Sequence, residues 1–139
     1  MSFHKLKYIL IRWLPTRGRR WQRLPLQDVR VFLLYNLVVV ANKQQIIDLL
    51  RKNSPKLRKL GVKRVGIFGS FAAGTQTANS DVDLLVEFNK GQKNFHNFMG
   101  TANFTEAIMG RNVDLLTPES LSPYIGPYIE KEVEYVQVT

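Results

Sequence analysis

The chain has 139 residues, of which 45% are hydrophobic, and this is enough for one compact domain with a core but too little for two. It contains no cysteine, which excludes a disulfide framework and a thiolate zinc site and favours a reducing compartment, so we expect a cytoplasmic protein. The net charge of +9 at pH 7 raises nucleic acid or an acidic membrane surface as partners.

Most of that charge lies in the first part of the chain. Residues 1–37 hold eight of the 20 Lys and Arg residues and one of the 11 acidic residues. This segment has no sustained helical or alternating pattern, so we interpret it as a basic, poorly ordered extension, with an aromatic and basic nucleic-acid tail as the alternative. The apolar stretch at residues 31–41 is shorter than the roughly 20 residues of a membrane span, so we expect no membrane partner.

From residue 42 the pattern becomes regular. Asn42 followed by Gln45 predicts the start of a helix, and apolar residues at helical spacing continue it over residues 43–53. Pro55 begins a second short helix that Gly61 ends. The next elements are strand 63–70, helix 71–74, polar loop 75–80, strand 81–88, helix 95–110, strand 111–117 and a closing segment 118–138, helical in its middle and extended at its end. This order predicts an α/β (α+β) domain.

Two apolar groups in the second half of the chain bear on packing. Phe95, Phe98, Met99 and Ala102 recur at helical spacing, which predicts that they pack in the core. The later run "SPYIGPYIE" places two tyrosines beside prolines, and either a partner-binding surface or ordinary packing accounts for it.

Two acidic residues lie inside an otherwise apolar strand. Side chains alternate along a strand, so Asp81 and Asp83 point to one face, about 6.6 Å apart at the backbone. Like charges so placed repel one another, and no Lys or Arg lies within residues 76–87 to compensate. A divalent cation that prefers oxygen ligands, Mg²⁺ or Mn²⁺, would compensate. The structural alternative makes Asp81 a turn residue and Asp83 a solvent-facing residue of an edge strand.

A glycine and a serine precede these acids by one strand-turn-strand unit. Gly69 lets the backbone approach a ligand closely, and the hydroxyl and backbone N–H of Ser70 suit phosphate oxygens. A phosphate-binding turn opposite a metal-binding carboxylate pair is what phosphoryl or nucleotidyl transfer requires, because its catalysis is mainly positioning and charge neutralisation.

The motif formed by these four residues resembles a known family. Gly69 and Ser70, then ten residues, then Asp81 and Asp83 match the Gly-Ser, ten residues, Asp-x-Asp signature of the DNA polymerase beta superfamily of nucleotidyltransferases. The chain is most similar to its minimal nucleotidyltransferase antitoxins, which are found beside HEPN-domain toxins. The resemblance covers residues 42–138 and implies a minimal nucleotidyltransferase domain at residues 38–139, a mixed β-sheet with helices packed on it.

The resemblance also implies a site and a reaction. Asp114 occupies the place of the family's third carboxylate, and Glu87 is a less suitable substitute. Asp81, Asp83 and Asp114 would then be catalytic and would bind two Mg²⁺ ions, with Mn²⁺ as the other option, while Gly69 and Ser70 would bind ATP. The expected activity is transfer of AMP from ATP to a tyrosine of the cognate HEPN toxin.

Two alternatives stay open beside this activity. Many family members have an arginine where this chain has Ala73, which favours an antitoxin that has lost its chemistry and neutralises its toxin by binding alone. The third hypothesis is a nucleic-acid-binding protein that uses residues 1–37.

Overall fold

The computed structural model describes residues 13–15, 21–23 and 39–138. The chain divides into two compact units, Met1–Val38 and Val39–Thr139, and each is described by itself. In the first unit β1 (Trp13–Pro15) pairs antiparallel with β2 (Trp21–Arg23). Apart from these two strands, the predictions of a poorly ordered extension and of a nucleic-acid tail at residues 1–37 fall outside the described residues.

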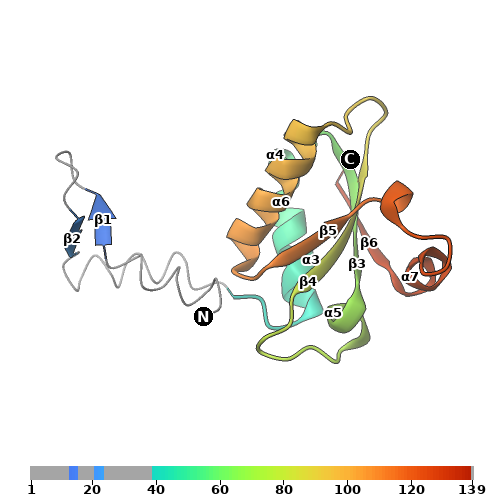
Figure 1. Cartoon of the computed structure of the whole chain (residues 1–139), viewed down its shortest axis with the longest axis horizontal. Helices are drawn as coiled ribbons and strands as arrows, with labels where there is room; N and C mark the ends of the chain where they lie inside the picture. Colours follow the sequence, from blue (N-terminus) through green and yellow to red (C-terminus); the bar gives the residue numbers. More distant parts are fainter. Residues whose placement is uncertain (1–12, 16–20, 24–38, 139) are drawn as a thin grey trace. The chain divides into compact units, whose positions relative to one another are not determined.

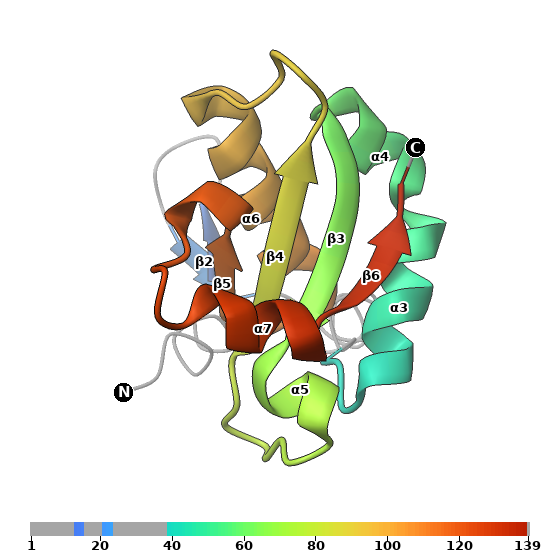
Figure 2. The ribbon, with the colours of Figure 1, turned by 90° about the vertical axis from the view of Figure 1, so that its right-hand side faces the viewer.

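The second unit is built on a four-stranded mixed sheet with the order β5-β4-β3-β6 (Figure 2). The strands are β3 (Val62–Phe68), β4 (Val82–Phe88), β5 (Val113–Leu116) and β6 (Glu134–Gln137). Strand β3 runs antiparallel to both β4 and β6, whereas β4 and β5 are parallel. The mixed sheet of the sequence prediction is therefore confirmed, and β6 is the extended end expected for the closing segment.

Three helices cover one face of this sheet (Figure 1), namely α3 (Lys43–Lys52), α4 (Ser54–Lys59) and α6 (Phe95–Met109). Helix α3 begins as predicted, because the Asn42 side chain accepts a hydrogen bond of 3.0 Å from the Gln45 backbone N–H. The helices meet the apolar inner face of the sheet, and the core comprises Val40, Ile46, Leu50, Leu57, Val65, Ile67, Val82, Leu84, Val86 and Met109, all 0% exposed.

The remaining helices lie at one end and on the opposite face of the sheet. Helix α5 (Gly69–Ala73) begins two residues earlier than the sequence predicted, so Gly69 and Ser70 start a helix rather than end a strand. A 3₁₀ turn, η1 (Pro118–Ser120), and helix α7 (Gly126–Glu132) follow β5, and α7 packs against α5. No helix among the described residues has the length and hydropathy needed to cross a lipid bilayer.

The packing of α6 corrects one sequence prediction. Phe98 and Ala102 pack against the core as expected, but the side chains of Phe95 and Met99 are 80% and 38% exposed. The buried stripe of α6 consists instead of Asn97, Thr101, Thr105 and Met109. Both threonine hydroxyls donate to the carbonyl four residues earlier, at 2.7 and 2.8 Å, so they can be buried without an outside partner. Apolar spacing alone was therefore right for Phe98 and Ala102 and wrong for Phe95 and Met99.

Candidate active site

The two faces of the sheet differ in chemistry because side chains alternate along each strand. The face opposite α3, α4 and α6 carries polar side chains in every strand. These side chains are Arg64 in β3, Asp83 and Glu87 in β4, Asp114 in β5 and Tyr135 in β6. Asp83 and Asp114 therefore lie on the face of the sheet opposite the core helices α3, α4 and α6.

Asp83 and Asp114 are direct neighbours on that face. Residues 82–85 and residues 113–116 have the same sequence, Val-Asp-Leu-Leu, and the two parallel strands pair so that each residue lies opposite its equivalent. Asp83 is thus opposite Asp114, and Asp81 immediately precedes β4. The repeated tetrapeptide was a usable signal for this register, since strands with the same apolar pattern bury the same positions when they align.

The negative charges of the other two carboxylates act on Asp83. Burial raises the pKa of Asp83 above its usual value of 3.8, and the negative charges of Asp114 and then Asp81 raise it further. Asp83 is half-buried, whereas Asp81 and Asp114 are exposed. The structure therefore places Asp83 beside Asp114 where β4 and β5 begin, and the charge of Asp81 reaches Asp83 from the residue before β4.

Gly69 places the predicted phosphate-binding turn against these acids. Its φ of +71° lies in the left-handed region, and a Cβ added there would overlap Oδ2 of Asp83 and lie 3.0 Å from its Cγ. The residue before it, Phe68, is opposite Asp83 in the antiparallel register of β3 and β4. A side chain at position 69 would therefore displace the carboxylate, and Ser70 follows as the second residue of α5.

Glu87, the substitute ligand considered from the sequence, is bound elsewhere. Its Oε1 accepts a hydrogen bond of 2.5 Å from Nη2 of Arg64, and the Arg64 guanidinium lies 3.8 Å from the centroid of the Tyr135 ring. The side chains of Arg64 and Glu87 are 32% and 20% exposed, so this ion pair is only partly open to solvent. Because its carboxylate is already neutralised, Glu87 is the poorer candidate for a metal ligand.

Arg111 is the residue that sequence reasoning missed. It is 8% exposed, and its Nε donates to the Val40 carbonyl at 2.7 Å. Its Nη1 donates to the carbonyls of Ala78 at 2.8 Å and Ser80 at 3.1 Å, and the guanidinium lies 5.3 Å from the centroid of the Phe71 ring in α5. One side chain from the start of β5 therefore holds the loop that leads into β4 and contacts the helix that follows β3.

The sequence indicates that the loop before β4 needs a hydrogen-bond donor, but not which residue supplies it. Residues 75–80 form a polar loop whose backbone carbonyl groups are not paired with a neighbouring strand. Those carbonyls that are partly buried need hydrogen-bond donors from other segments. An arginine just before a strand gives no indication that it is the donor. Arg111 is a positioning residue in this arrangement, because it touches the segments that carry the acids and not the acids themselves.

The donor set suits a metal ion that binds together with a nucleotide. Within residues 39–138, no three His, Asp or Glu side chains come close enough to hold a metal ion by themselves. Mg²⁺ is usually held by one or two carboxylates together with substrate phosphates and water, rather than by a complete protein cage. Carboxylates from two strands facing a Gly-Ser turn provide the protein's share of such ligands.

A mixed sheet with acids on two parallel strands and a Gly-Ser turn beside them defines a nucleotidyl-transfer fold, and comparison with known proteins agrees. The family profile of the nucleotidyltransferase domain matches residues 44–136. The chain belongs to this nucleotidyltransferase family. Its sequence is 38% identical over 95 residues to a candidate protein adenylyltransferase of Methanocaldococcus jannaschii, an alignment that covers 66% of this chain and 95% of that protein.

Three further comparisons place the chain among the minimal members of the family. It is 34% identical over 94 residues to the protein adenylyltransferase MntA of Thermococcus cleftensis, covering 67% of this chain and 94% of that protein. A solved minimal nucleotidyltransferase superposes with a TM-score of 0.53 and 27% identity over 63% of this chain and 93% of its own. A toxin-antitoxin crystal structure with AMP-PNP superposes with a TM-score of 0.50 and 26% identity, covering 71% and 73%.

Proposed function

We propose that this chain is an antitoxin that transfers AMP from ATP to a tyrosine hydroxyl of a cognate HEPN-domain toxin in the cytoplasm. Relatives that align over nearly their whole length are named as protein adenylyltransferases, and one structural neighbour is a toxin-antitoxin complex with an ATP analogue. The observation that carries the proposal is the placement of Asp83, which lies opposite Asp114 and directly against Gly69.

Different residues of the site would bind the phosphates and the metal ions. The hydroxyl and backbone N–H of Ser70 would donate to phosphate oxygens, and the absence of a side chain on Gly69 lets the Asp83 carboxylate lie directly against this turn. Asp81, Asp83 and Asp114 would hold two Mg²⁺ ions together with the phosphate oxygens of the nucleotide. When bound, these ions neutralise phosphate charge and lower the pKa of the acceptor hydroxyl, which is near 10 for a free tyrosine.

The transfer itself is an in-line displacement at the α-phosphorus. The acceptor oxygen forms a bond to the α-phosphorus. At the same time the bond between the α-phosphorus and the α–β bridging oxygen breaks, and pyrophosphate leaves with that electron pair. Asp114 is exposed and can take the proton of the acceptor hydroxyl and pass it to solvent. The AMP group then adds a bulky anion to the toxin, which would block a ribonuclease site.

A second candidate function is neutralisation by binding alone. Ala73, the last residue of α5, is exposed and occupies the position where many family members have an arginine. If that arginine assists catalysis in relatives, this chain lacks the arginine's contribution to the reaction. The two functions share a fold and a partner, and they differ in whether the acids are needed.

The decisive experiment incubates the chain and its HEPN toxin with Mg²⁺ and ATP labelled at the α-phosphate. We expect label on the toxin with the wild-type chain, loss of label with Asp81→Asn or Asp83→Asn, and no change with Glu87→Gln, the matched control that alters a neighbouring acid on the same face. A wild-type chain that neutralises the toxin without labelling it, together with an Asp83→Asn variant that neutralises equally well, would favour binding alone and refute the enzymatic proposal.

A further inference from the structure

An apolar pocket lies beside the candidate active site, between the start of α6, the end of β5 and η1. It has a volume of about 540 Å³, within the range of pockets that bind small molecules or large side chains. Its apolar lining comes from Phe95 and Phe98 of α6 and from Leu115 and Leu116 of β5, and Lys93 and Thr117 lie at its polar edge. We refer to it as the α6–β5 pocket.

Exposed apolar side chains extend this pocket onto the surface of α6. Phe95 is 80% exposed at the pocket, and Met99, one helical turn later, is 38% exposed. An aromatic side chain that is left almost fully in water beside a pocket indicates a surface that another molecule covers, because contiguous exposed apolar groups are uncommon unless they bind something.

The pocket shares a strand with the catalytic acids. Leu116 lies two residues after Asp114 in β5 and on the same face, about 6.6 Å further along the strand. Strand β5 is also the outer strand of the sheet on this side, since the order is β5-β4-β3-β6. A molecule bound in the α6–β5 pocket therefore reaches the acids along an edge that no other described strand occupies.

The geometry of the reaction assigns this edge to the acceptor. In an in-line displacement the attacking and leaving oxygens lie on opposite sides of the phosphorus. The phosphate-binding turn at Gly69 and Ser70 follows β3, which places the leaving pyrophosphate on the β3 side of β4. Strand β5 lies on the other side of β4, so the acceptor must approach across β5.

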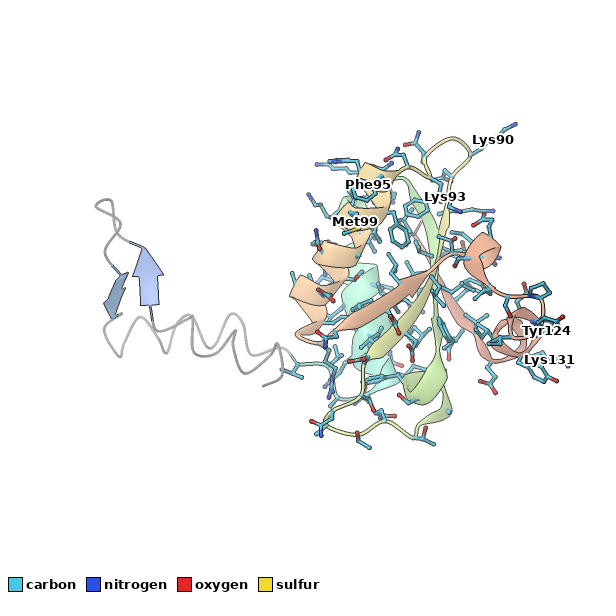
Figure 3. The ribbon with its side chains drawn as sticks, viewed as in Figure 1. Lys90, Lys93, Phe95, Met99, Tyr124 and Lys131 are labelled. Atoms are coloured by element: carbon cyan, nitrogen blue, oxygen red, sulfur yellow. The ribbon has the colours of Figure 1, made fainter. Side chains whose placement is uncertain are left out.

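Charge at the rim of the pocket restricts what the acceptor presents there. Figure 3 shows Lys90, Lys93, Phe95 and Met99 at one end of the domain, away from Tyr124 and Lys131. Lys93 lines the pocket and binds Glu119 at 2.8 Å with the two side chains 48% and 67% exposed, so a stronger carboxylate partner can replace this contact. Lys90 does not line the pocket, but it is exposed at the same end of the domain and adds positive charge there. The rim therefore suits an acidic segment that also carries an apolar side chain.

We propose that the α6–β5 pocket is the docking site for the acceptor protein, which inserts an aromatic or aliphatic side chain beside Phe95 and places a carboxylate near Lys90 and Lys93. The inference rests on the proposed transfer of AMP to a protein. It differs from a second exposed surface, Tyr124, Ile125 and Tyr128, which are 85%, 57% and 71% exposed. That surface adjoins α7, and α7 packs against α5 on the leaving-group side.

The test compares Phe95→Ser with Tyr124→Ser, a matched control that removes an equally exposed aromatic side chain from the other surface. Affinity for the HEPN toxin is measured by calorimetry, and the KM for toxin, the KM for ATP and kcat are measured by label transfer. We expect Phe95→Ser to weaken toxin affinity and raise the toxin KM by about tenfold or more, with kcat and the KM for ATP unchanged. We expect Tyr124→Ser to behave as the wild type.

Each outcome decides a different claim. If the wild-type chain binds the toxin but transfers no AMP, the proposed enzymatic activity is refuted. A loss of toxin affinity in Phe95→Ser would still support the docking site in that case. A Phe95→Ser variant with unchanged affinity and toxin KM overturns the docking site and leaves the activity intact, and an impaired Tyr124→Ser would then assign the contact to the other surface. Phe95 is mostly in water, so its substitution should preserve the melting temperature, and Lys90→Glu, whose effect should fade with salt, provides an independent second variant.

Discussion

Replacing Asp83 with asparagine should stabilise the chain while it abolishes transfer. In the absence of a cation, the half-buried Asp83 carboxylate faces the charges of Asp114 and Asp81, and this repulsion together with burial raises its pKa. Asparagine has nearly the same shape and no charge, so the variant keeps the packing and removes the repulsion. Such a gain in stability is typical when a charge is kept for function at a cost to the fold.

The size of the effect follows from the spacing of the strands. Parallel neighbours such as Asp83 and Asp114 lie about 5 Å apart, and Asp81 lies roughly 6.6 Å from Asp83 along the chain. At water-like screening, each pair of charges costs about 0.6–0.8 kcal/mol, and salt reduces the sum for these exposed neighbours to about 1 kcal/mol. For a domain of this size, that corresponds to a rise in melting temperature of roughly 4–6 °C.

The assay is thermal unfolding of wild type, Asp83→Asn and the control Asp48→Asn at pH 7.5 with a metal chelator. Asp48 is an exposed residue of α3 that accepts a hydrogen bond from Gln44 at 2.9 Å, so its replacement should change stability by about 0.5 kcal/mol or less. An Asp83→Asn variant that melts at or below the wild-type temperature would mean that the three carboxylates do not repel one another, and the shared site would be refuted.

The same comparison has a defined dependence on pH. Because the pKa of Asp83 is raised above 3.8 in the folded chain, the folded state binds this proton more tightly than the unfolded state does. The contribution of Asp83 to stability therefore improves as pH falls through its folded pKa. The advantage of Asp83→Asn should be largest at neutral pH and should shrink towards pH 4, and an advantage that grows on acidification would contradict the assignment.

Substitutions at three further positions test the supporting residues. Gly69→Ala should lower the free energy of unfolding by about 1–3 kcal/mol in a urea titration and impair transfer, because its φ is +71° and its Cβ would overlap Asp83. Arg111→Met should cost about 3 kcal/mol or more, since it leaves buried carbonyls without a donor, and Arg111→Lys should cost less. Glu87→Gln should transfer AMP within about twofold of the wild-type initial rate, because Glu87 binds Arg64.

Each of these has a result that would count against it. Wild-type stability in Gly69→Ala would mean that the turn does not lie against the acid. Equal stability of Arg111→Met and wild type would remove its role in holding the loop before β4. A large loss of activity in Glu87→Gln would indicate that the ion pair with Arg64 opens and that Glu87 serves the site.

The short-range features of the site were accessible from the sequence. The alternation of Asp81 and Asp83 with apolar residues determines which face they occupy, and the spacing from Gly69 and Ser70 spans one strand-turn-strand unit. Asp114 followed from the resemblance to the family, and the repeated Val-Asp-Leu-Leu explains its register in physical terms. These features depend on local periodicity or on a repeated pattern, which a sequence displays directly.

The features that sequence reading missed depend on contacts between distant segments. Arg111 donates hydrogen bonds to the carbonyls of Val40 and Ser80, which are distant in the sequence, and the residues next to Arg111 in the sequence do not indicate these bonds. Phe95 and Met99 were assigned to the core because they are apolar, whereas Thr101 and Thr105 occupy the buried stripe. A threonine whose hydroxyl binds its own helix packs as an apolar residue does, and a hydropathy pattern cannot record that bond.

The most direct test of the shared acidic site is calorimetric binding of an ATP analogue whose α–β bridge cannot be cleaved, with and without Mg²⁺, to wild type, Asp83→Asn and Glu87→Gln. We expect binding that requires Mg²⁺, that weakens about tenfold or more in Asp83→Asn, and that is unchanged in Glu87→Gln. Equal affinity of wild type and Asp83→Asn, or full binding without Mg²⁺, would contradict a site in which Asp81, Asp83 and Asp114 hold metal against the nucleotide phosphates.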